Sequence, residues 1–295
     1  MNKHYIYALG FFDGVHLGHQ ALLASCVSLA REGGFIPGAV TFAAHPDALV
    51  LHGAPGLINT MEDRKALLRR FGMENIVALP FDEAMRCLPW EDFLTLLLET
   101  RGGAGFVCGE DFRFGFRGEG NAESLARFCR DRGLPWAVVP EQTLEGTRIS
   151  STVIRKLLEG GDMAGANRFL GHSHILTGGV IPGHQLGRRL GIPTANLALP
   201  GELAVPKFGV YACLCRVDGQ EYPAVTNIGV RPTVSGQGIT VEPWILDYDG
   251  DLYGREITLE FQAFLRPERK FPDLESLKAE IHRNATQTRT LLNTP

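Results

Sequence analysis

Short apolar runs alternate with helix-like segments through the first 160 residues, and this alternation constrains the fold more than any other feature of the chain. The runs are short enough to be strands and apolar enough to be buried on both faces; they cover residues 6–9, 39–42, 76–79, 106–108 and 137–139. The segments between them have helical spacing of apolar residues and end at Gly33, Gly72, Gly102 and Gly133, and Thr60, Pro89 and Asn121 mark the starts of three of them. The pattern predicts an α/β domain with a parallel sheet and helices on both faces.

Residues typical of ligand sites follow four of these five strands. His16 and His19 come after the first strand, His45 after the second, Asp111 after the fourth, and the helix after the fifth strand begins near Arg148. Ligands of parallel sheets bind beyond the carboxyl ends of the strands. Each residue alone has a plainer explanation as a turn, a residue before proline or a helix cap, but four of them on one sheet edge favour a nucleotide site.

The loop after the first strand has the features of a phosphate site. Gly10 and Gly14 allow tight turns, and a helix begins near His19, so that its free N–H groups and its dipole face the loop. His16 and His19 could each donate a hydrogen bond to phosphate. A metal site is the weaker interpretation, because no Glu or Cys accompanies the pair at the spacing of a zinc site. A turn with two idle histidines stays the plain alternative.

The segment RISSTVIR at residues 148–155 predicts a second phosphate contact. Its hydroxyl groups lie at the start of a helix, and Arg155 follows one turn later, which suits a triphosphate. The chain has no GxxxxGK(S/T) motif, and no GxGxxG follows the first strand, so neither a P-loop enzyme nor a dinucleotide dehydrogenase is supported. Adenylyl transfer fits better, because positioning and charge stabilisation supply most of its catalysis.

Period-two alternation replaces the helical pattern beyond residue 170. It covers residues 210–217 and 222–228, joined by an Asp218–Gly219 turn, and returns at residues 257–261. Short strands broken by Gly and Pro predict a small closed or nearly closed barrel, followed by a helix around residues 274–283. The domain boundary is expected near residues 170–174, which divides the chain into domains of residues 1–170 and 171–295.

Three stretches of the second half carry candidate chemistry. Residues 179–197 are Gly-rich and end in Thr194 and Asn196, whose oxygens could help to hold Mg²⁺; a plain barrel loop is the alternative. Residues 227–233 form a loop with a fixed Arg231, or only a turn. Glu242 interrupts an apolar strand, where a carboxylate is costly unless it is paired or used as a general base; an exposed edge position would also explain it.

Composition excludes several classes of protein. The chain has 295 residues, 44% hydrophobic and 21% charged, and no apolar run approaches the ~20 residues of a membrane span. Its net charge of −4, without a basic cluster, argues against nucleic acid as a partner. No leader precedes the first strand, and the six cysteines form no CxxC motif. We therefore expect a cytoplasmic protein with buried, reduced thiols.

The motifs together resemble those of the bacterial bifunctional riboflavin kinase/FAD synthetases over essentially the whole chain. GFFDGVHLGH, TFAAHP, GEDFRFG and RISSTVIR resemble the adenylyltransferase half of that family, and GRRLGIPTANL, NIGVRPT, the Glu242 strand, DYDGDLYG and LRPERKF resemble the kinase half. The resemblance implies a Rossmann-like nucleotidyltransferase domain, followed by a six-stranded riboflavin-kinase-type barrel with a terminal helix. It also implies two consecutive reactions, from riboflavin to FMN and from FMN to FAD, with ATP as co-substrate and Mg²⁺ as cofactor.

The resemblance also implies roles for individual residues. In the adenylyltransferase half, where His16, His19 and Arg155 would be catalytic, the ATP-binding residues would be Gly10, Phe11, Asp13, His16, His19, His45, Asp111, Arg148, Ser151, Thr152 and Arg155. In the kinase half, ATP and flavin would contact Gly183, Gly187, Arg188, Gly191, Pro193, Thr194, Asn196, Asn227, Arg231, Glu242 and Arg266. Thr194 and Asn196 would bind the metal, and Glu242 would activate the riboflavin 5′-hydroxyl. The expected partners are riboflavin, FMN and ATP, without nucleic acid or membrane, and weak self-association is left open.

Some positions depart from the pattern associated with the family, including Ala43–Ala44, Asn121, His172 and Pro243. Pro243 cannot donate a hydrogen bond to a neighbouring strand, which predicts that Glu242 lies at an edge or a bulge. One alternative is an enzyme that keeps a single activity. Another is a flavin- or nucleotide-binding regulator without turnover, which the intact set of motifs argues against because a binding protein needs no general base.

Overall fold

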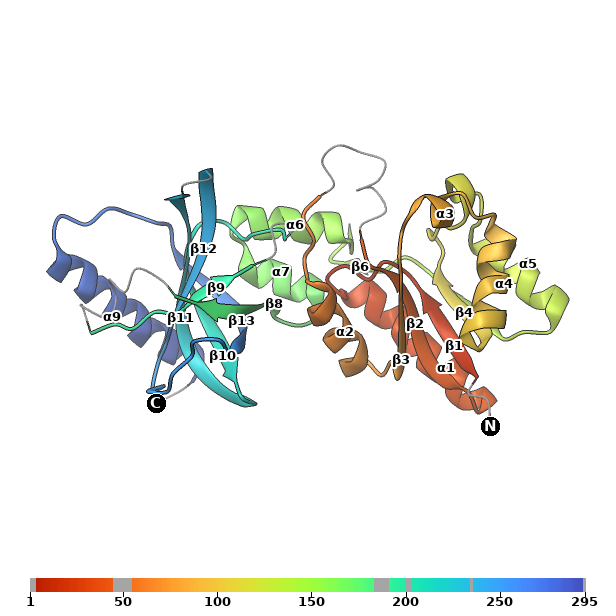
Figure 1. Ribbon diagram of the computed structural model, residues 1–295, viewed down its shortest axis with the longest axis horizontal. Coiled ribbons are helices and arrows are strands. Elements are labelled where there is room, and N and C mark those ends of the chain that lie inside the picture. The colour runs from red at the N-terminus through yellow and green to blue at the C-terminus, as the bar shows by residue number, and fades with distance from the viewer. Residues whose placement is uncertain (1–3, 45–54, 183–190, 200–202, 234–235, 294–295) are drawn as a thin grey trace. The chain divides into compact units, whose positions relative to one another are not determined.

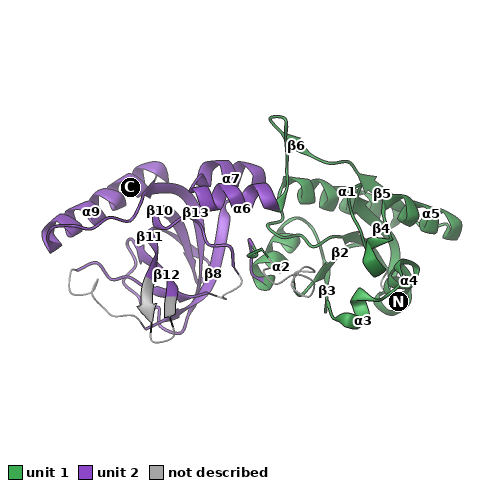
Figure 2. Ribbon diagram, turned by 90° about the horizontal axis from the view of Figure 1, so that it is seen from above, with its two compact units in different colours: residues 1–57, 61–151 green, residues 58–60, 152–295 purple. Residues whose placement is uncertain are grey.

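The computed structural model describes residues 4–44, 55–182, 191–199, 203–233 and 236–293, with the backbone alone at 231–233 and 236–237. The chain divides into two compact units (Figure 2). The first consists of Met1–Leu57 and Met61–Ser151, and the second of Ile58–Thr60 and Thr152–Pro295. Each unit is described by itself below. Within the described ranges, no helix combines the length and the apolar composition needed to cross a membrane.

The first unit is built on a five-stranded parallel sheet in the order β3-β2-β1-β4-β5 (Figure 1). Its strands are β1 (Tyr5–Leu9), β2 (Ile36–Phe42), β3 (Asn75–Leu79), β4 (Gly103–Gly109) and β5 (Trp136–Val139). Each lies at a predicted apolar run. The predicted parallel sheet is confirmed, and β1, the central strand, is almost completely buried.

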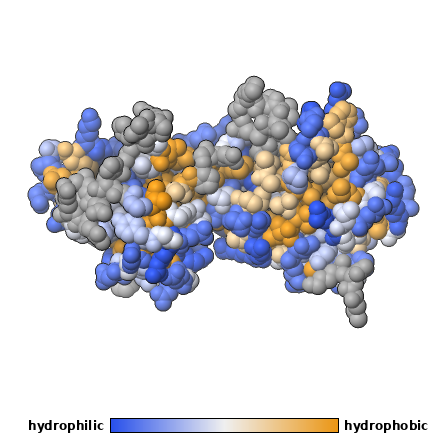
Figure 3. All heavy atoms as spheres, in the orientation of Figure 1, coloured by the Kyte–Doolittle hydropathy of each residue, from blue (hydrophilic) through white to orange (hydrophobic). Residues whose placement is uncertain are grey.

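Helices cover both faces of this sheet. They are α1 (Leu17–Gly33), α2 (Met61–Arg70), α3 (Glu83–Arg86), α4 (Trp90–Arg101) and α5 (Ala122–Arg132). On one face, Tyr7 and Leu9 pack in a cluster with Phe93 of α4 and Phe128 of α5. Residues of α1 are absent from that cluster although this helix contacts β1, β2 and β4, so it covers the other face. Figure 3 shows hydrophobic residues gathered over the region of β2, β3 and α4.

The observed ends of α4 and α5 agree with the capping residues from which the sequence analysis predicted them. Asn121 caps α5 in a capping box with Ser124, and α4 and α5 end at Gly102 and Gly133 in the left-handed conformation. A short 3₁₀ turn, η2 (Phe116–Gly118), precedes α5. A two-stranded hairpin of β6 (Thr143–Leu144) and β7 (Thr147–Arg148) follows β5 and was not predicted, because strands of two residues have no recognisable period.

The second unit is a closed barrel of six strands in the order β10-β11-β12-β9-β8-β13, as predicted. Its antiparallel strands are β8 (His174–Ile181), β9 (Asn196–Ala198), β10 (Gly209–Val217), β11 (Gln220–Thr233), β12 (Gly236–Ile245) and β13 (Glu256–Arg266). The predicted Asp218–Gly219 turn joins β10 to β11, and both of its residues have positive φ, 50° and 82°. Closure removes the exposed strand edges of a sheet this small.

Among the described residues, three helices belong largely to this unit. The helices α6 (Ser151–Gly160) and α7 (Met163–Leu170) precede the barrel, and α9 (Leu274–Leu291) follows it and packs on β10 and β11. The helical pattern stops at Gly171, where expected, but contacts group α6 and α7 with the barrel from Thr152 onward. The division at residues 170/171 therefore stays a prediction.

Candidate active sites

The loop between β1 and α1 has a strained backbone. Phe12 and Val15 have φ angles of 57° and 41° although neither is glycine, and both side chains are fully buried. Such conformations cost about 1–3 kcal/mol each and persist only where the surroundings hold them. Two hydroxyl groups hold this loop: Thr41 Oγ1 donates to the carbonyl of Phe11 at 2.8 Å, and Ser151 Oγ donates to the carbonyl of Asp13 at 2.9 Å. The loop is therefore fixed from β2 and from the first residue of α6.

His16 and His19 lie together at the N-terminus of α1, as the sequence predicted. His16 is the N-cap, and its Nδ1 accepts a hydrogen bond from the backbone N of His19 at 3.3 Å. The two rings stack with centroids 3.6 Å apart and planes 14° apart. Because Nδ1 of His16 is an acceptor, we assign the proton of its neutral ring to Nε2, where it could be donated to an anion.

His19 is kept neutral by its surroundings. Burial, followed by the nearby His16 and Arg64, lowers the pKa of His19 well below its ordinary value. Its buried Nδ1 has no hydrogen-bond partner. Two neutral stacked imidazoles at a helix N-terminus can donate hydrogen bonds to phosphate without the repulsion that two stacked cations would have.

Sequence reasoning missed Arg64, which also lies beside this loop. Its guanidinium carbon is 4.2 Å from the centroid of the Phe11 ring, and its Nη2 is 3.9 Å from Oδ1 of Asp13. A signal for it exists in the sequence, because Arg64 occupies the same buried stripe of α2 as Leu67 and Leu68. An arginine at an apolar position of an amphipathic helix is unusual enough to mark a site.

The structure also brings Asp111 and Arg148 together. Nη2 of Arg148 is 2.5 Å from Oδ2 of Asp111 and 2.6 Å from Oε1 of Glu141. All three side chains are substantially exposed, so solvent screens these pairs and they contribute little to stability. Arg148 can therefore exchange its carboxylate partners for another anion at low cost.

The remaining predicted ATP contacts are Gly10, His45, Thr152 and Arg155. Thr152 and Arg155 lie on α6 and are grouped with the second unit, Thr152 exposed and Arg155 buried. Gly10 directly follows β1, and a Cβ there would lie only 3.0 Å from the Phe12 ring. His45 lies outside the described residues. Contacts of these four residues with ATP stay predictions.

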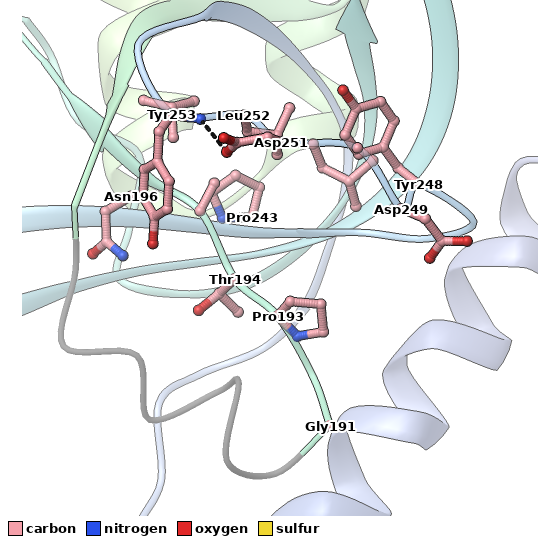
Figure 4. Close-up of a pocket in the computed structure, with 14 residues that line it drawn as sticks. Gly191, Pro193, Thr194, Asn196, Pro243, Tyr248, Asp249, Asp251, Leu252 and Tyr253 are labelled. Carbon is pink, nitrogen blue, oxygen red and sulfur yellow. Dashed lines mark hydrogen bonds between the residues drawn. The ribbon is translucent and has the colours of Figure 1, made fainter.

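A cavity of about 690 Å³ opens in the barrel unit at the predicted metal residues (Figure 4). The lining includes Gly191, Pro193 and Thr194 from the segment before β9, and Asn196 from the start of β9. The loop between β12 and β13 contributes Tyr248, Asp249, Gly250, Asp251, Leu252 and Tyr253, in which the backbone N of Tyr253 donates to Asp251 Oδ1 at 3.0 Å. The sequence pattern had marked this loop as part of a motif but had assigned no site residue in it.

The cavity offers the oxygen ligands that a hard cation prefers. Thr194 and Asn196 carry a hydroxyl and an amide oxygen, and Asp249 and Asp251 add carboxylates. In the described ranges, no three His, Cys, Asp or Glu side chains are grouped closely enough to form a metal cage. This donor set suits Mg²⁺ bound mainly through substrate phosphates and fits a transition metal poorly.

Asn227, Glu242 and Arg266 form one row across the barrel wall. Glu242 on β12 is opposite Asn227 on β11, which is opposite Val210 on β10, which is opposite Arg266 on β13. Directly opposite residues share a face of the sheet. This is the face that α9 covers, because Nε of Arg266 donates to Oδ1 of Asn284 at 3.0 Å. Glu242 and Asn227 are thus neighbours, Arg266 lies in the same row beyond Val210, and none of the three lines the cavity.

Pro243 follows Glu242 in β12, so its side chain is on the opposite face of the strand, where it lines the cavity. Its carbonyl accepts a hydrogen bond from the backbone N of Ala195 at 2.9 Å, so its missing N–H is on the β9 side and not on the β11 side. The register of β11 with β12 continues through Pro243 without a bulge, and β12 pairs with β9 only at Val241. The prediction allowed an edge or a bulge: the bulge is wrong, and the edge is confirmed, because the pairing of β12 with β9 among the described residues stops at Val241.

The side chains of four further predicted kinase residues are not described. Gly183, Gly187 and Arg188 lie outside the described residues, and only the backbone of Arg231 is described, within β11. Contacts of these residues with ATP or flavin stay predictions.

Two family models match the chain in sequence. One, described as FAD synthetase, matches residues 1–153, and the other, described as riboflavin kinase, matches residues 170–292. A solved structure described as a macrolide-efflux protein from Streptococcus pneumoniae is also similar, with a TM-score of 0.87 and 28% identity over 98% of this chain and 95% of that chain. That description names a function that neither family model has, and likeness of fold does not decide function.

Curated relatives match over nearly the full length. A bifunctional riboflavin kinase/FMN adenylyltransferase from Pseudomonas fluorescens is 36% identical over 96% of this chain and 91% of its own. Enzymes of the same description from Escherichia coli K12 and Listeria monocytogenes are 33% and 32% identical, each over 96% of this chain and 91% of their own. The chain belongs to the family of bifunctional riboflavin kinase/FMN adenylyltransferases.

Proposed function

We propose that this chain phosphorylates riboflavin to FMN and then adenylylates FMN to FAD, with ATP as the donor in both steps. The observation that carries the proposal is the presence of both family matches in one chain, at residues 1–153 and 170–292, in the order found in its full-length relatives. The loop of His16 and His19 supports a nucleotide phosphate site in the first unit. The cavity at Thr194 and Asn196 supports a second site in the barrel.

In the kinase step, the 5′-hydroxyl oxygen of riboflavin forms a bond to the γ-phosphorus of ATP. The bond from that phosphorus to the β-γ bridging oxygen breaks, and ADP leaves. Glu242 takes the hydroxyl proton as general base. Thr194 and Asn196 would hold Mg²⁺ together with the ATP phosphates, and the ion would neutralise charge on the transferring group. Asn227 and Arg266, in the same row as Glu242, support a polar site around this base.

In the adenylyl step, an oxygen of the FMN phosphate forms a bond to the α-phosphorus of ATP. The bond from that phosphorus to the β-phosphate oxygen breaks, and pyrophosphate leaves. The chain needs no nucleophile of its own for this exchange, so its residues bind, orient and stabilise charge. His16 and His19 donate hydrogen bonds to the phosphates, and Arg148 leaves its carboxylate partners to join them, with Thr152 and Arg155 as further contacts.

The protein works in the cytoplasm, where its thiols stay reduced. All six cysteines are free, and all except Cys87 are buried. Its partners are small molecules, and a weak homo-oligomer remains part of the proposal.

Conversion of flavins by the purified chain tests the proposal. The chain is incubated with riboflavin, ATP and Mg²⁺, and the flavins are separated by chromatography. FMN that appears first and is followed by FAD supports both activities. FAD formed only from added FMN would reduce the proposal to the adenylyl step, and the absence of both products would leave a binding protein and refute it.

Two variants separate the sites. Glu242→Gln removes the general base and should slow FMN formation by roughly 10²–10⁴-fold while FAD formation from FMN continues. His19→Ala should slow FAD formation and leave FMN formation intact. Both rates are measured on each protein, so that the untouched reaction serves as the control for folding. Equal damage to both reactions in either variant would contradict two separate sites.

A further inference from the structure

Arg64 is the largest fully buried side chain in the described part of the protein, and no step proposed above uses it. Its Nη1 donates to the carbonyl of Phe42 at 3.2 Å, but its Nε and Nη2 have no hydrogen-bond partner. Removing a guanidinium from water costs several kcal/mol, and an apolar side chain of similar volume is often at least as stabilising. Packing therefore does not explain why an arginine is present here.

The contacts of Arg64 with the described residues converge on the β1–α1 loop and the end of β2. Phe42 ends β2, the Phe11 ring lies under the guanidinium, and Asp13, only 1% exposed, is the carboxylate at 3.9 Å. A cation over an aromatic face is attracted by the ring, and more strongly when it is desolvated. Arg64 thus holds two side chains of the loop, and Thr41 and Ser151 hold the carbonyls of the same two residues.

The conformation of this loop matters because the end of the loop determines the positions of His16 and His19. Val15, one of the two strained residues, lies directly before His16, and the ring of the other, Phe12, contacts the His19 ring edge-on at a centroid distance of 5.2 Å. A change in the loop backbone would move the N-cap of α1 and separate the stacked rings. The contacts of Arg64 and the strained loop backbone therefore both contribute to the placement of His16 and His19.

We propose that Arg64 is a positioning residue of the adenylyl-transfer site: it fixes the β1–α1 loop through Phe11 and Asp13, and thereby the stacked rings of His16 and His19. The inference rests on the proposed FAD synthesis. Arg64 does not contact the nucleotide, because its side chain is fully buried. Its charge has a second effect, since Arg64 acts with burial and His16 to lower the pKa of His19. Asp13, on the loop, is the carboxylate that faces the Arg64 guanidinium.

Two substitutions at Arg64 and one control test the proposal. Arg64→Met removes the charge at similar volume, Arg64→Lys keeps the charge without the planar group, and Arg70→Met changes an exposed arginine of the same helix. For each full-length protein, kcat and the KM for ATP of FAD formation from FMN are measured across neutral and acidic pH. FMN formation from riboflavin is measured on the same samples.

We expect Arg64→Met to lower kcat of FAD formation by roughly 100-fold, the size of effect that a misplacement of about 1 Å produces. The KM for ATP should change by less than about threefold, because the residue makes no contact with substrate. The acidic limb of the pH profile should move upward in Arg64→Met, where the pKa of His19 rises, and stay in place in Arg64→Lys. Arg64→Lys should lower kcat by roughly 10-fold, and FMN formation should be unchanged in all three variants.

Several results would overturn the inference. A kcat in either Arg64 variant equal to that of Arg70→Met would remove the positioning role. A raised KM with unchanged kcat would make Arg64 a direct nucleotide ligand. Parallel loss of FMN and FAD formation would make it a general stability residue; if Arg64→Met does not fold, the kcat and pH profile of Arg64→Lys decide. A wild-type chain that forms no FAD would instead overturn the proposed function, which the wild-type sample shows before any variant is compared.

Discussion

His16 has two roles that one substitution can separate. It caps α1 through its ring and places an imidazole beside the proposed phosphate site. His16→Ala removes both roles, whereas His16→Asn replaces the cap with a residue of high N-cap preference and removes only the imidazole. Comparing the two variants therefore distinguishes the cap from the chemistry.

The expected loss of stability follows from the cap geometry. Losing an N-cap costs about 0.5–2 kcal/mol, and the 3.3 Å distance is long for such a bond, so we expect about 1 kcal/mol for His16→Ala. In a unit of this size, that corresponds to a fall in Tm of about 2–4 °C. His16→Asn should keep a Tm near that of the wild type. Scanning calorimetry of the full chain measures this difference.

The activity of the same variants should not follow their stability. FAD formation should fall by roughly 10–100-fold in both His16→Ala and His16→Asn, because neither carries a ring that can donate to phosphate. Asn121→Ala is the matched control, since it removes the N-cap of α5 in the same unit, where the bond is 2.9 Å, without removing an imidazole. It should lose stability and keep FAD formation. Wild-type FAD formation by His16→Asn would refute a chemical role for His16.

Two further predictions concern protonation. Burial, followed by His172, lowers the pKa of His174 to about 3, so the unfolded chain binds the extra proton below the ordinary pKa of about 6.5. The stability that depends on neutral His174 is therefore present above pH ~6.5 and is lost as the pH falls toward 3; His174→Phe should flatten this acidic slope in denaturant titrations, and an unchanged slope would contradict the assignment. Iodoacetamide at mildly alkaline pH should label Cys87 first, because Cys87 is exposed whereas burial raises the pKa of Cys26 to about 11 and of Cys108 to about 12. Peptide mapping that finds Cys26 or Cys108 labelled before Cys87 would contradict this order.

The sequence predicted the parallel sheet well because strands buried on both faces appear as uninterrupted apolar runs. The sequence did not predict the second half of α9, because that stretch has few apolar residues. Residues 284–290 are mostly polar, and the helix continues there because Ala285 and Thr288 are buried. Periodicity of apolar residues cannot detect a helix whose packing face is made of small polar side chains.

The loop of His16 and His19 shows which features of the site local sequence rules predict and which they do not. Spacing predicted that His16 and His19 would be close, and they stack. The start of α1 was placed two residues too late, because an imidazole at the N-cap is not one of the usual Ser, Thr, Asp or Asn signals. Arg64 lies far from the loop in sequence, and only the parallel pairing of β1 and β2, with α2 after them, brings it there. The helical spacing of α2 marks Arg64 as a buried arginine, but its contacts with the loop are consequences of topology and have no local signature.

The alternation of side chains between the two faces of β12 gives a sharper test of Glu242 as the general base of the kinase step. Pro243 and Ile245 line the cavity, so Glu242 belongs to the other face by the strand period of two, and the carboxylates that line the cavity are those of Asp249 and Asp251. Asp251 already accepts the backbone N–H of Tyr253, which gives it a role in the turn. If the cavity alone held both reactants, Asp249→Asn would abolish FMN formation and Glu242→Gln would spare it. The opposite result would place the riboflavin hydroxyl at the row of Glu242, Asn227 and Arg266, and the transferred phosphoryl group would then have to reach that face of β12 as well.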